Sequence, residues 1–184
     1  MKPKIGVMGG ASGPHSKENI EKAGAIGKAI AEKGAILFFG ATTGLPLEAA
    51  KACKKAGGFV VGVSPGENEK EHTEVYGYPT EACDIMVYTG MGLAGGRNIV
   101  LVKSCDAIVL IEGGIGTMNE FSIAYPAKIP IGVLEGSGRF ADEVERLEKE
   151  VLKGKYGTTL IFEKNPEKLV EKIVSAAKAM KQKP

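Results

Sequence analysis

Seven short apolar runs divide the chain, at residues 5–8, 35–39, 59–63, 84–88, 107–111, 129–134 and 159–162. Most of these runs lack a regular alternation of apolar and polar positions, which is typical of strands buried on both faces of a sheet. Segments with helical character lie between them, at residues 17–33, 45–56, 97–104, 117–125, 140–153 and 166–180. Pro166 suits the first turn of the last helix, and Asn165 suits its N-cap. The alternation predicts a doubly wound parallel α/β sheet of about seven strands, with helices on both faces.

Composition narrows the class of protein. The 184 residues are 43% hydrophobic and 25% charged, without a repeat or a linker, so we expect one globular domain over residues 1–184. The formal net charge of +2 speaks against a nucleic-acid partner. Three cysteines without metal-ligand spacing indicate a reducing compartment and no metal site. With no signal peptide and no apolar stretch near the ~20 residues of a membrane span, the sequence predicts a cytoplasmic protein without membrane contact.

Glycine is the residue that departs from average usage. The chain holds 26 glycines among 184 residues, about twice the usual share of ~7%. Sixteen of them follow the predicted strands, where the carboxyl ends of parallel strands meet. Because ligands of open α/β sheets bind outside those carboxyl ends, this rim is the predicted functional face.

Two glycine-rich loops on this rim can hold an anion. The first joins strand 5–8 to its helix and carries Gly10 and Ser12; the second follows strand 35–39 and carries Gly40, Thr42 and Thr43. Bare backbone N–H groups beside a helix N-terminus attract phosphate, although tight turns that bind nothing have the same composition. The second strand ends without an acidic residue, and neither G-x-G-x-x-G nor a Walker phosphate loop occurs. These absences speak against the usual NAD and ATP sites.

The loop after the buried strand 107–111 has the most specific pattern. Gly113, Gly114, Gly116 and Thr117 can turn backbone N–H groups and a hydroxyl toward a phosphate. Glu120 follows Thr117 by three residues and can face the same rim. The same spacing is also a capping box, in which the glutamate returns to the helix backbone instead of performing chemistry. Both interpretations fit the spacing.

A single arginine opens the helix predicted at residues 97–104, directly after the glycine-rich stretch 89–96. On this rim, Arg97 can pair in bidentate fashion with a phosphate or a carboxylate. The alternative is an ordinary surface arginine, solvated or paired with a neighbouring acid.

With Arg97 and residues 113–120 in view, the chain resembles the SLOG superfamily of Rossmann-like proteins. That superfamily includes the LONELY GUY cytokinin-activating phosphoribohydrolases, long mislabelled as lysine decarboxylases, the DprA-like proteins and the molybdenum-cofactor carrier proteins. Its hallmark is Pro-Gly-Gly-x-Gly-Thr-x-x-Glu, preceded by an arginine-containing helix. Residues 113–120 match every position after the leading proline, where Glu112 stands. The similarity covers most of the chain and looks closest to the carrier-protein branch, with its glycine-rich stretch before Arg97 and Asn98.

The resemblance implies a Rossmann-like nucleotide-binding domain whose ligand is a phosphate-bearing nucleotide or a pterin-type small molecule. In the phosphoribohydrolase form, the target is the N-glycosidic bond of a nucleoside 5′-monophosphate. Gly114, Gly116 and Thr117 would then hold the phosphate, and Arg97 and Glu120 would be the catalytic pair. In the carrier or sensor form, the chain binds a nucleotide or the molybdenum cofactor without turnover. No further cofactor is required, and a homo-oligomer, a dimer or a tetramer, is implied.

Two positions depart from the phosphoribohydrolase pattern, in which lysine follows the arginine and proline precedes the glycines. Here those positions hold Asn98 and Glu112. A carboxylate beside a phosphate repels it, unless the carboxylate points away or binds a cation. The decarboxylase label fails on chemistry, because a pyridoxal enzyme needs a Schiff-base lysine and none of the glycine-motif loops contains one.

The segment of residues 64–80 is long and charged, and it lies on the functional rim. A loop of this length can serve as a lid or a subunit contact, or it can be a mobile surface excursion. His72 lies within it, and a lone histidine in a polar loop is expected to be solvated.

Overall fold

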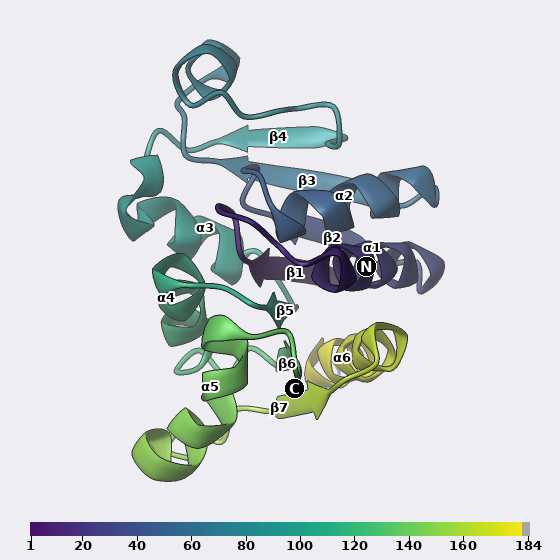
Figure 1. Cartoon of the computed structure of the whole chain (residues 1–184), viewed down its shortest axis with the longest axis vertical. Coiled ribbons are helices and arrows are strands. Elements are labelled where there is room, and N and C mark those ends of the chain that lie inside the picture. Colours follow the sequence, from purple (N-terminus) through teal and green to yellow (C-terminus); the bar gives the residue numbers. More distant parts are fainter. Residues whose placement is uncertain (182–184) are drawn as a thin grey trace.

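The structure, a computed structural model, describes residues 1–181. Within that range, seven strands alternate with six α-helices along most of the chain (Figure 1). The strands are β1 (Lys4–Gly9), β2 (Ile36–Phe39), β3 (Phe59–Ser64), β4 (Ile85–Tyr88), β5 (Ala107–Ile111), β6 (Ile131–Leu134) and β7 (Leu160–Glu163). The helices are α1 (Lys17–Glu32), α2 (Leu45–Lys55), α3 (Arg97–Lys103), α4 (Ile115–Ala124), α5 (Arg139–Leu147) and α6 (Pro166–Lys181). Three one-turn π-helical segments, Glu71–Val75, Gly92–Gly96 and Glu148–Leu152, complete the elements.

All strands join one parallel sheet, in the order β4-β3-β2-β1-β5-β6-β7. The chain builds outward from β1 to β4 and then returns to place β5 on the other side of β1. In Figure 1 the arrowheads of β1, β3 and β4 accordingly point to the same side. The order reverses between β1 and β5, so the carboxyl ends of these two strands mark the crevice in which such sheets bind ligands. The predicted doubly wound α/β fold is confirmed.

The core has two layers, one on each face of the sheet. In β5 every residue is buried: Val109 and Ile111 pack with the helices α1, α2 and α6, whereas Ile108 and Leu110 pack with α3, α4 and α5. A strand covered on both faces needs apolar side chains at every position, which explains the unbroken apolar run in the sequence. The prediction of helices on both faces therefore holds.

The predicted elements differ from the structure mainly at their ends. Helix α4 begins at Ile115, two residues before the predicted start, and α5 changes to a π-helical turn after Leu147. The N-cap of α6 is confirmed, because Asn165 Oδ1 accepts a hydrogen bond from the N–H of Lys168 at 2.8 Å. No element was predicted between β3 and β4, where the structure has the Glu71–Val75 turn.

Helices α1 and α2 approach closely at a glycine. A Cβ atom on Gly27 would lie 1.9 Å from the carbonyl oxygen of Ala49, so no larger residue fits there. At the rim, the N–H of Leu45 donates to Gly10 O at 2.9 Å, and Thr43 Oγ1 donates to Ala11 O at 2.6 Å. The loops after β1 and β2 are thereby joined to each other directly and through the helices that follow them.

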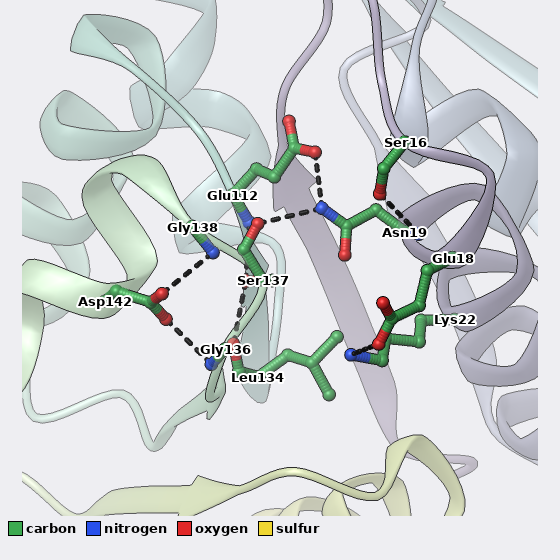
Figure 2. A network of polar contacts seen from close by, with 10 residues as sticks. All are labelled: Ser16, Glu18, Asn19, Lys22, Glu112, Leu134, Gly136, Ser137, Gly138 and Asp142. Atoms are coloured by element: carbon green, nitrogen blue, oxygen red, sulfur yellow. Dashed lines mark hydrogen bonds and ion pairs between the residues drawn. The ribbon is translucent and has the colours of Figure 1, made fainter.

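A buried carboxylate joins three further segments of the rim. Glu112 Oε2 lies 2.8 Å from His15 Nδ1, and Glu112 Oε1 accepts a hydrogen bond from Asn19 Nδ2 at 2.6 Å. Asn19 Nδ2 also donates to the carbonyl of Ser137, and Ser137 Oγ accepts from the N–H of Glu112 at 2.9 Å (Figure 2). The loop after β6 is closed by Asp142, which accepts from two glycine N–H groups in the same figure. Glu112 therefore links the start of α1, the end of β5 and the loop before α5.

We expect Glu112→Ala to lower the free energy of unfolding by about 1–3 kcal/mol, because it leaves buried donors without an acceptor. Urea unfolding of the purified variant measures this loss. Glu21→Ala is the matched control, since Glu21 is exposed on α1 in a surface pair with Lys17 and should change stability by at most about 0.5 kcal/mol. Equal stability of the two variants would contradict the structural role of Glu112.

Candidate functional site

A cavity of about 400 Å³ opens at the carboxyl ends of β1 and β2. It is walled by the loops after these strands, by the starts of α3 and α4, and by one residue of the segment between β3 and β4. Its lining includes eight of the residues predicted for the site, namely Ser12, Gly40, Thr42, Thr43, Arg97, Gly116, Thr117 and Glu120. The cavity therefore lies on the predicted glycine-rich rim, next to the point between β1 and β5 where the strand order reverses.

A smaller hollow of about 200 Å³ adjoins the cavity. Two further predicted residues, Gly10 and Gly114, line it, and Ser12, Gly116 and Thr117 line both spaces. Gly113 lines neither of them. It has a φ of +95°, and a Cβ there would lie 2.5 Å from Thr117. Gly113 therefore shapes the turn into α4 and is not part of the wall.

Arg97 and Glu120 meet at the inner end of the cavity. Arg97 Nη1 lies 3.7 Å from Glu120 Oε1, and the two residues are 8% and 7% exposed. Gly40 provides the space for the guanidinium, because a Cβ there would lie 2.3 Å from Arg97 Nη1. The alternative that Arg97 is a surface arginine is wrong.

Two of the three nitrogen atoms of the Arg97 guanidinium lack hydrogen-bond partners. Its Nε and Nη1 are buried and make no hydrogen bond within the described part of the chain. Burial lowers the pKa of Arg97, against the opposing effects of Glu120 and Tyr78. Burial likewise raises the pKa of Glu120 to about 7, although Arg97 acts in the opposite direction. Groups with such perturbed pKa values in a cleft are typical of functional sites.

The capping-box interpretation of Glu120 is also wrong. Helix α4 has Gly114 as its N-cap, without a side-chain cap, so Thr117 and Glu120 both lie inside the helix. The first helical hydrogen bond of α4 runs from Met118 N to Gly114 O. The N–H groups of Ile115, Gly116 and Thr117 precede that bond and remain available at the helix N-terminus, where anions bind.

One predicted site residue, Thr43, has a different role from the one expected, and the motif departure at Glu112 has partners within the fold. The hydroxyl of Thr43 donates to Ala11 O, so it ties two loops together and is not a free donor. Glu112 lines neither hollow, and His15 and Asn19 bind its carboxylate, although a Cβ on Gly10 would lie only 2.9 Å from Glu112 Oε2.

Several residues of the wall were not predicted from the sequence. Tyr78 and Leu93 line the large cavity, Arg139 lines the small hollow, and Asn98 donates to Asn119 Oδ1 at 2.8 Å beside Arg97. Arg139 has a φ of +56°, which is unusual for a residue other than glycine. In the sequence, the one signal at Arg139 is its position directly after Gly138, a glycine in the loop that follows β6. The expectation that His72 is solvated is wrong, since it is fully buried.

Two features are absent from residues 1–181. Within them, no helix is both long and apolar enough to cross a membrane. The same residues contain no group of three or more His, Cys, Asp or Glu side chains placed to hold a metal ion.

Three known proteins are similar to this chain over most of its length. The molybdenum cofactor binding protein of Rippkaea orientalis is 28% identical, with a TM-score of 0.76 over 95% of this chain and 97% of its own. The Moco carrier protein of Chlamydomonas reinhardtii is 27% identical, with a TM-score of 0.78 over 97% and 99%. A probable cytokinin riboside 5′-monophosphate phosphoribohydrolase of Oryza sativa subsp. japonica, LOGL9, is 26% identical over 159 residues, which are 82% of this chain and 66% of the rice protein.

The family itself is shown by a sequence model that matches almost the whole chain. The model of the SLOG cluster4 family covers residues 2–170, which include both hollows and the Arg97–Glu120 pair. The predicted resemblance to the SLOG superfamily is confirmed, and the solved carrier proteins agree with the branch that looked closest. The chain belongs to the SLOG cluster4 family.

Proposed function

We propose that this protein binds a phosphate-bearing nucleotide or pterin-type ligand at the carboxyl-end rim of the sheet. The phosphate occupies the smaller hollow, and the rest of the ligand fills the larger cavity toward Arg97. The names of the similar proteins support this class of ligand, since they include binders of the molybdenum cofactor and a nucleoside monophosphate hydrolase.

The observation that carries the proposal is the unsatisfied guanidinium of Arg97. Two buried N–H-bearing atoms point to no acceptor in the described chain, and the group lines an open cavity. Leaving buried donors of a charged group unpaired costs several kcal/mol. An oxygen-rich ligand in the cavity would give the guanidinium charge a second partner besides Glu120, so the arrangement favours a ligand with hydroxyl or oxyanion groups at that end.

The smaller hollow suits the phosphate. The N-terminus of α4 faces it with free N–H groups, and the loop of Gly10 and Ser12 forms the opposite wall. Arg139 stands at its edge and has no ion pair with any residue between 1 and 181. A phosphomonoester dianion there would meet one guanidinium and the positive end of a helix dipole.

Hydrolysis of an N-glycosidic bond is a second candidate, and the titration of Glu120 favours it. In that reaction the bond from C1′ to the base nitrogen breaks, water adds its oxygen to C1′, and a proton passes to the base. The ionised carboxylate of Glu120 would take the proton of the water or stabilise the oxocarbenium-like charge at C1′. With a pKa near 7 it changes state at the pH of the cell. If turnover is absent, the same site serves a carrier or sensor of a nucleotide or of the molybdenum cofactor.

A second copy of the chain is the proposed partner, as a dimer or a tetramer. Large apolar side chains are exposed directly before and on the Gly92–Gly96 turn and on α3 and α4: Met91, Leu93, Ile99, Ile115 and Met118. A large cluster of exposed apolar side chains is typical of a protein–protein contact. Leu93 and Ile115 also line the cavity, so a partner on this face would help to close the site.

We expect AMP or GMP at about 100 times its Kd to stabilise the protein by about 2.7 kcal/mol, which is a rise in Tm of roughly 5–10 °C. Thermal melts with the nucleotides and with the molybdenum cofactor measure the shift. Arg97→Gln should lose most of it, whereas Arg146→Gln, which removes an exposed arginine from α5, should keep it. The absence of any shift in the wild-type protein would overturn the proposed function.

If the site hydrolyses nucleoside monophosphates, release of free base from AMP, GMP, CMP or UMP should rise with pH through about 7. The reason is that the required carboxylate form of Glu120 becomes more populated as pH increases past its raised pKa. Chromatography of the reaction mixtures detects the base, and Glu120→Gln should reduce the rate by at least roughly 100-fold. Ligand-induced stabilisation without base release would instead identify a carrier or sensor.

For the oligomer, we expect Ile99→Asp to convert the assembly into a 19.3 kDa monomer, because a buried unpaired charge disfavours the contact. Light scattering after size exclusion measures the mass. Ile20→Asp is the control, since Ile20 is also exposed but lies on α1, on the other face of the sheet. A wild-type protein that is already monomeric would exclude the proposed partner.

A further inference from the structure

The segment between β3 and β4 has no role in the function proposed so far. It contains the π-helical turn Glu71–Val75. Tyr78 and Pro79 follow that turn, and β4 begins at Ile85. Tyr78 is the one residue of this segment that lines the large cavity. The contacts that fix Tyr78 in the cavity wall therefore determine which surface the ring presents to a ligand.

His72 is the anchor of the segment. Its side chain is fully buried, with Nδ1 2.8 Å from Ser64 Oγ and Nε2 3.3 Å from the carbonyl oxygen of Pro79. Because a carbonyl oxygen only accepts, Nε2 carries the proton, and Nδ1 accepts from the serine hydroxyl. Ser64 Oγ accepts in turn from the N–H of Gly66 at 2.9 Å. Both ring nitrogens of His72 thus have a partner within the segment or in β3.

The same histidine holds the chain on both sides of Tyr78. The N–H of Tyr78 donates to His72 O at 3.1 Å, and the next carbonyl, that of Pro79, faces the His72 ring. The ring of Tyr76 lies parallel to that of Tyr78, at 5.8 Å between centroids and 5° between planes. The His72 ring packs against Tyr78 at 5.8 Å in a tilted orientation. Tyr78 is thus fixed by backbone and by two neighbouring rings.

At the cavity, Tyr78 lies near the guanidinium of Arg97, whose pKa it acts to raise. Apolar wall residues such as Pro46, Leu93 and Ile115 complete this part of the lining. A fixed aromatic ring and aliphatic neighbours recognise a flat, apolar surface, and a nearby guanidinium recognises oxygen atoms attached to it. A heteroaromatic ring that carries carbonyl or hydroxyl groups has both features.

We propose that Tyr78 recognises the planar ring of the ligand and that His72 is the residue that positions it. The inference rests on the proposed function, which it deepens: the ligand is a heteroaromatic phosphomonoester, its phosphate at the start of α4 and its ring against Tyr78. A purine nucleotide and a pterin phosphate share this chemistry.

The chain contains no tryptophan, so Tyr78→Trp places a single fluorescent reporter in the cavity wall. AMP, GMP or a pterin phosphomonoester should change its emission in a saturable way, and the ester that acts at the lowest concentration identifies the ring. Ribose 5-phosphate, which lacks a heteroaromatic ring, should leave the emission almost unchanged. Tyr156→Trp is the control, because Tyr156 is partly exposed and packs on Tyr125 outside both hollows.

Affinity measurements then test the role itself. Tyr78→Ala should weaken binding of the heteroaromatic ester by roughly 10- to 100-fold, the usual loss when a stacking residue is removed, and leave ribose 5-phosphate unaffected. Tyr78→Phe should retain most of the affinity, and His72→Gln should show part of the Ala effect with the same selectivity for heteroaromatic ligands. Wild-type binding that survives unchanged in Tyr78→Ala overturns this inference alone. If the wild-type protein binds neither the heteroaromatic esters nor ribose 5-phosphate, the proposed function fails and the inference falls with it.

Discussion

The guanidinium of Arg97 is buried beside a single carboxylate at 3.7 Å, with two of its nitrogen atoms lacking an acceptor in the described chain. This arrangement is unfavourable for the protein by itself, because a charge removed from water must regain its interactions from neighbours. Gly40 leaves space for the guanidinium because it has no side chain, but it offers no hydrogen-bond acceptor to Nε or Nη1. Burial also raises the pKa of Glu120, which favours the uncharged form of the carboxyl group beside Arg97. Strain of this kind is retained where a ligand completes the interactions.

The sequence predicts the sheet well for a physical reason. A strand such as β5 is covered on both faces, so its apolar run has no gaps and is visible without any knowledge of its neighbours. The position of the cavity could be predicted as well, because glycines that cluster after strand ends are typical of a rim where the backbone can approach a ligand closely. Arg97 and Glu120 could be named as candidates, yet their contact could not be predicted, because it depends on the packing of α3 against α4.

The errors of prediction concern polar groups whose partners are distant in sequence. Thr117 and Glu120 have the spacing of a helix cap, but α4 begins at Ile115 after the N-cap Gly114, so both residues lie inside the helix. His72 lies among charged residues and was expected to be solvated, but the fold supplies Ser64 and Pro79 as partners on either side of its ring. Local pattern contains no information on such pairings, which arise when a loop folds back on itself.

The backbone of Glu112 has a further consequence for the family motif. Its φ is +53°, a conformation that proline cannot adopt because its ring fixes φ near −65°. Proteins with proline at this position must therefore turn from β5 into α4 along a different path, and the start of α5, which bonds to the carbonyls of Glu112 and Gly113, must follow. The two forms of the loop are not interconvertible by one substitution. A graft between relatives would have to transfer His15, Asn19 and Ser137 together with Glu112, as one structural unit.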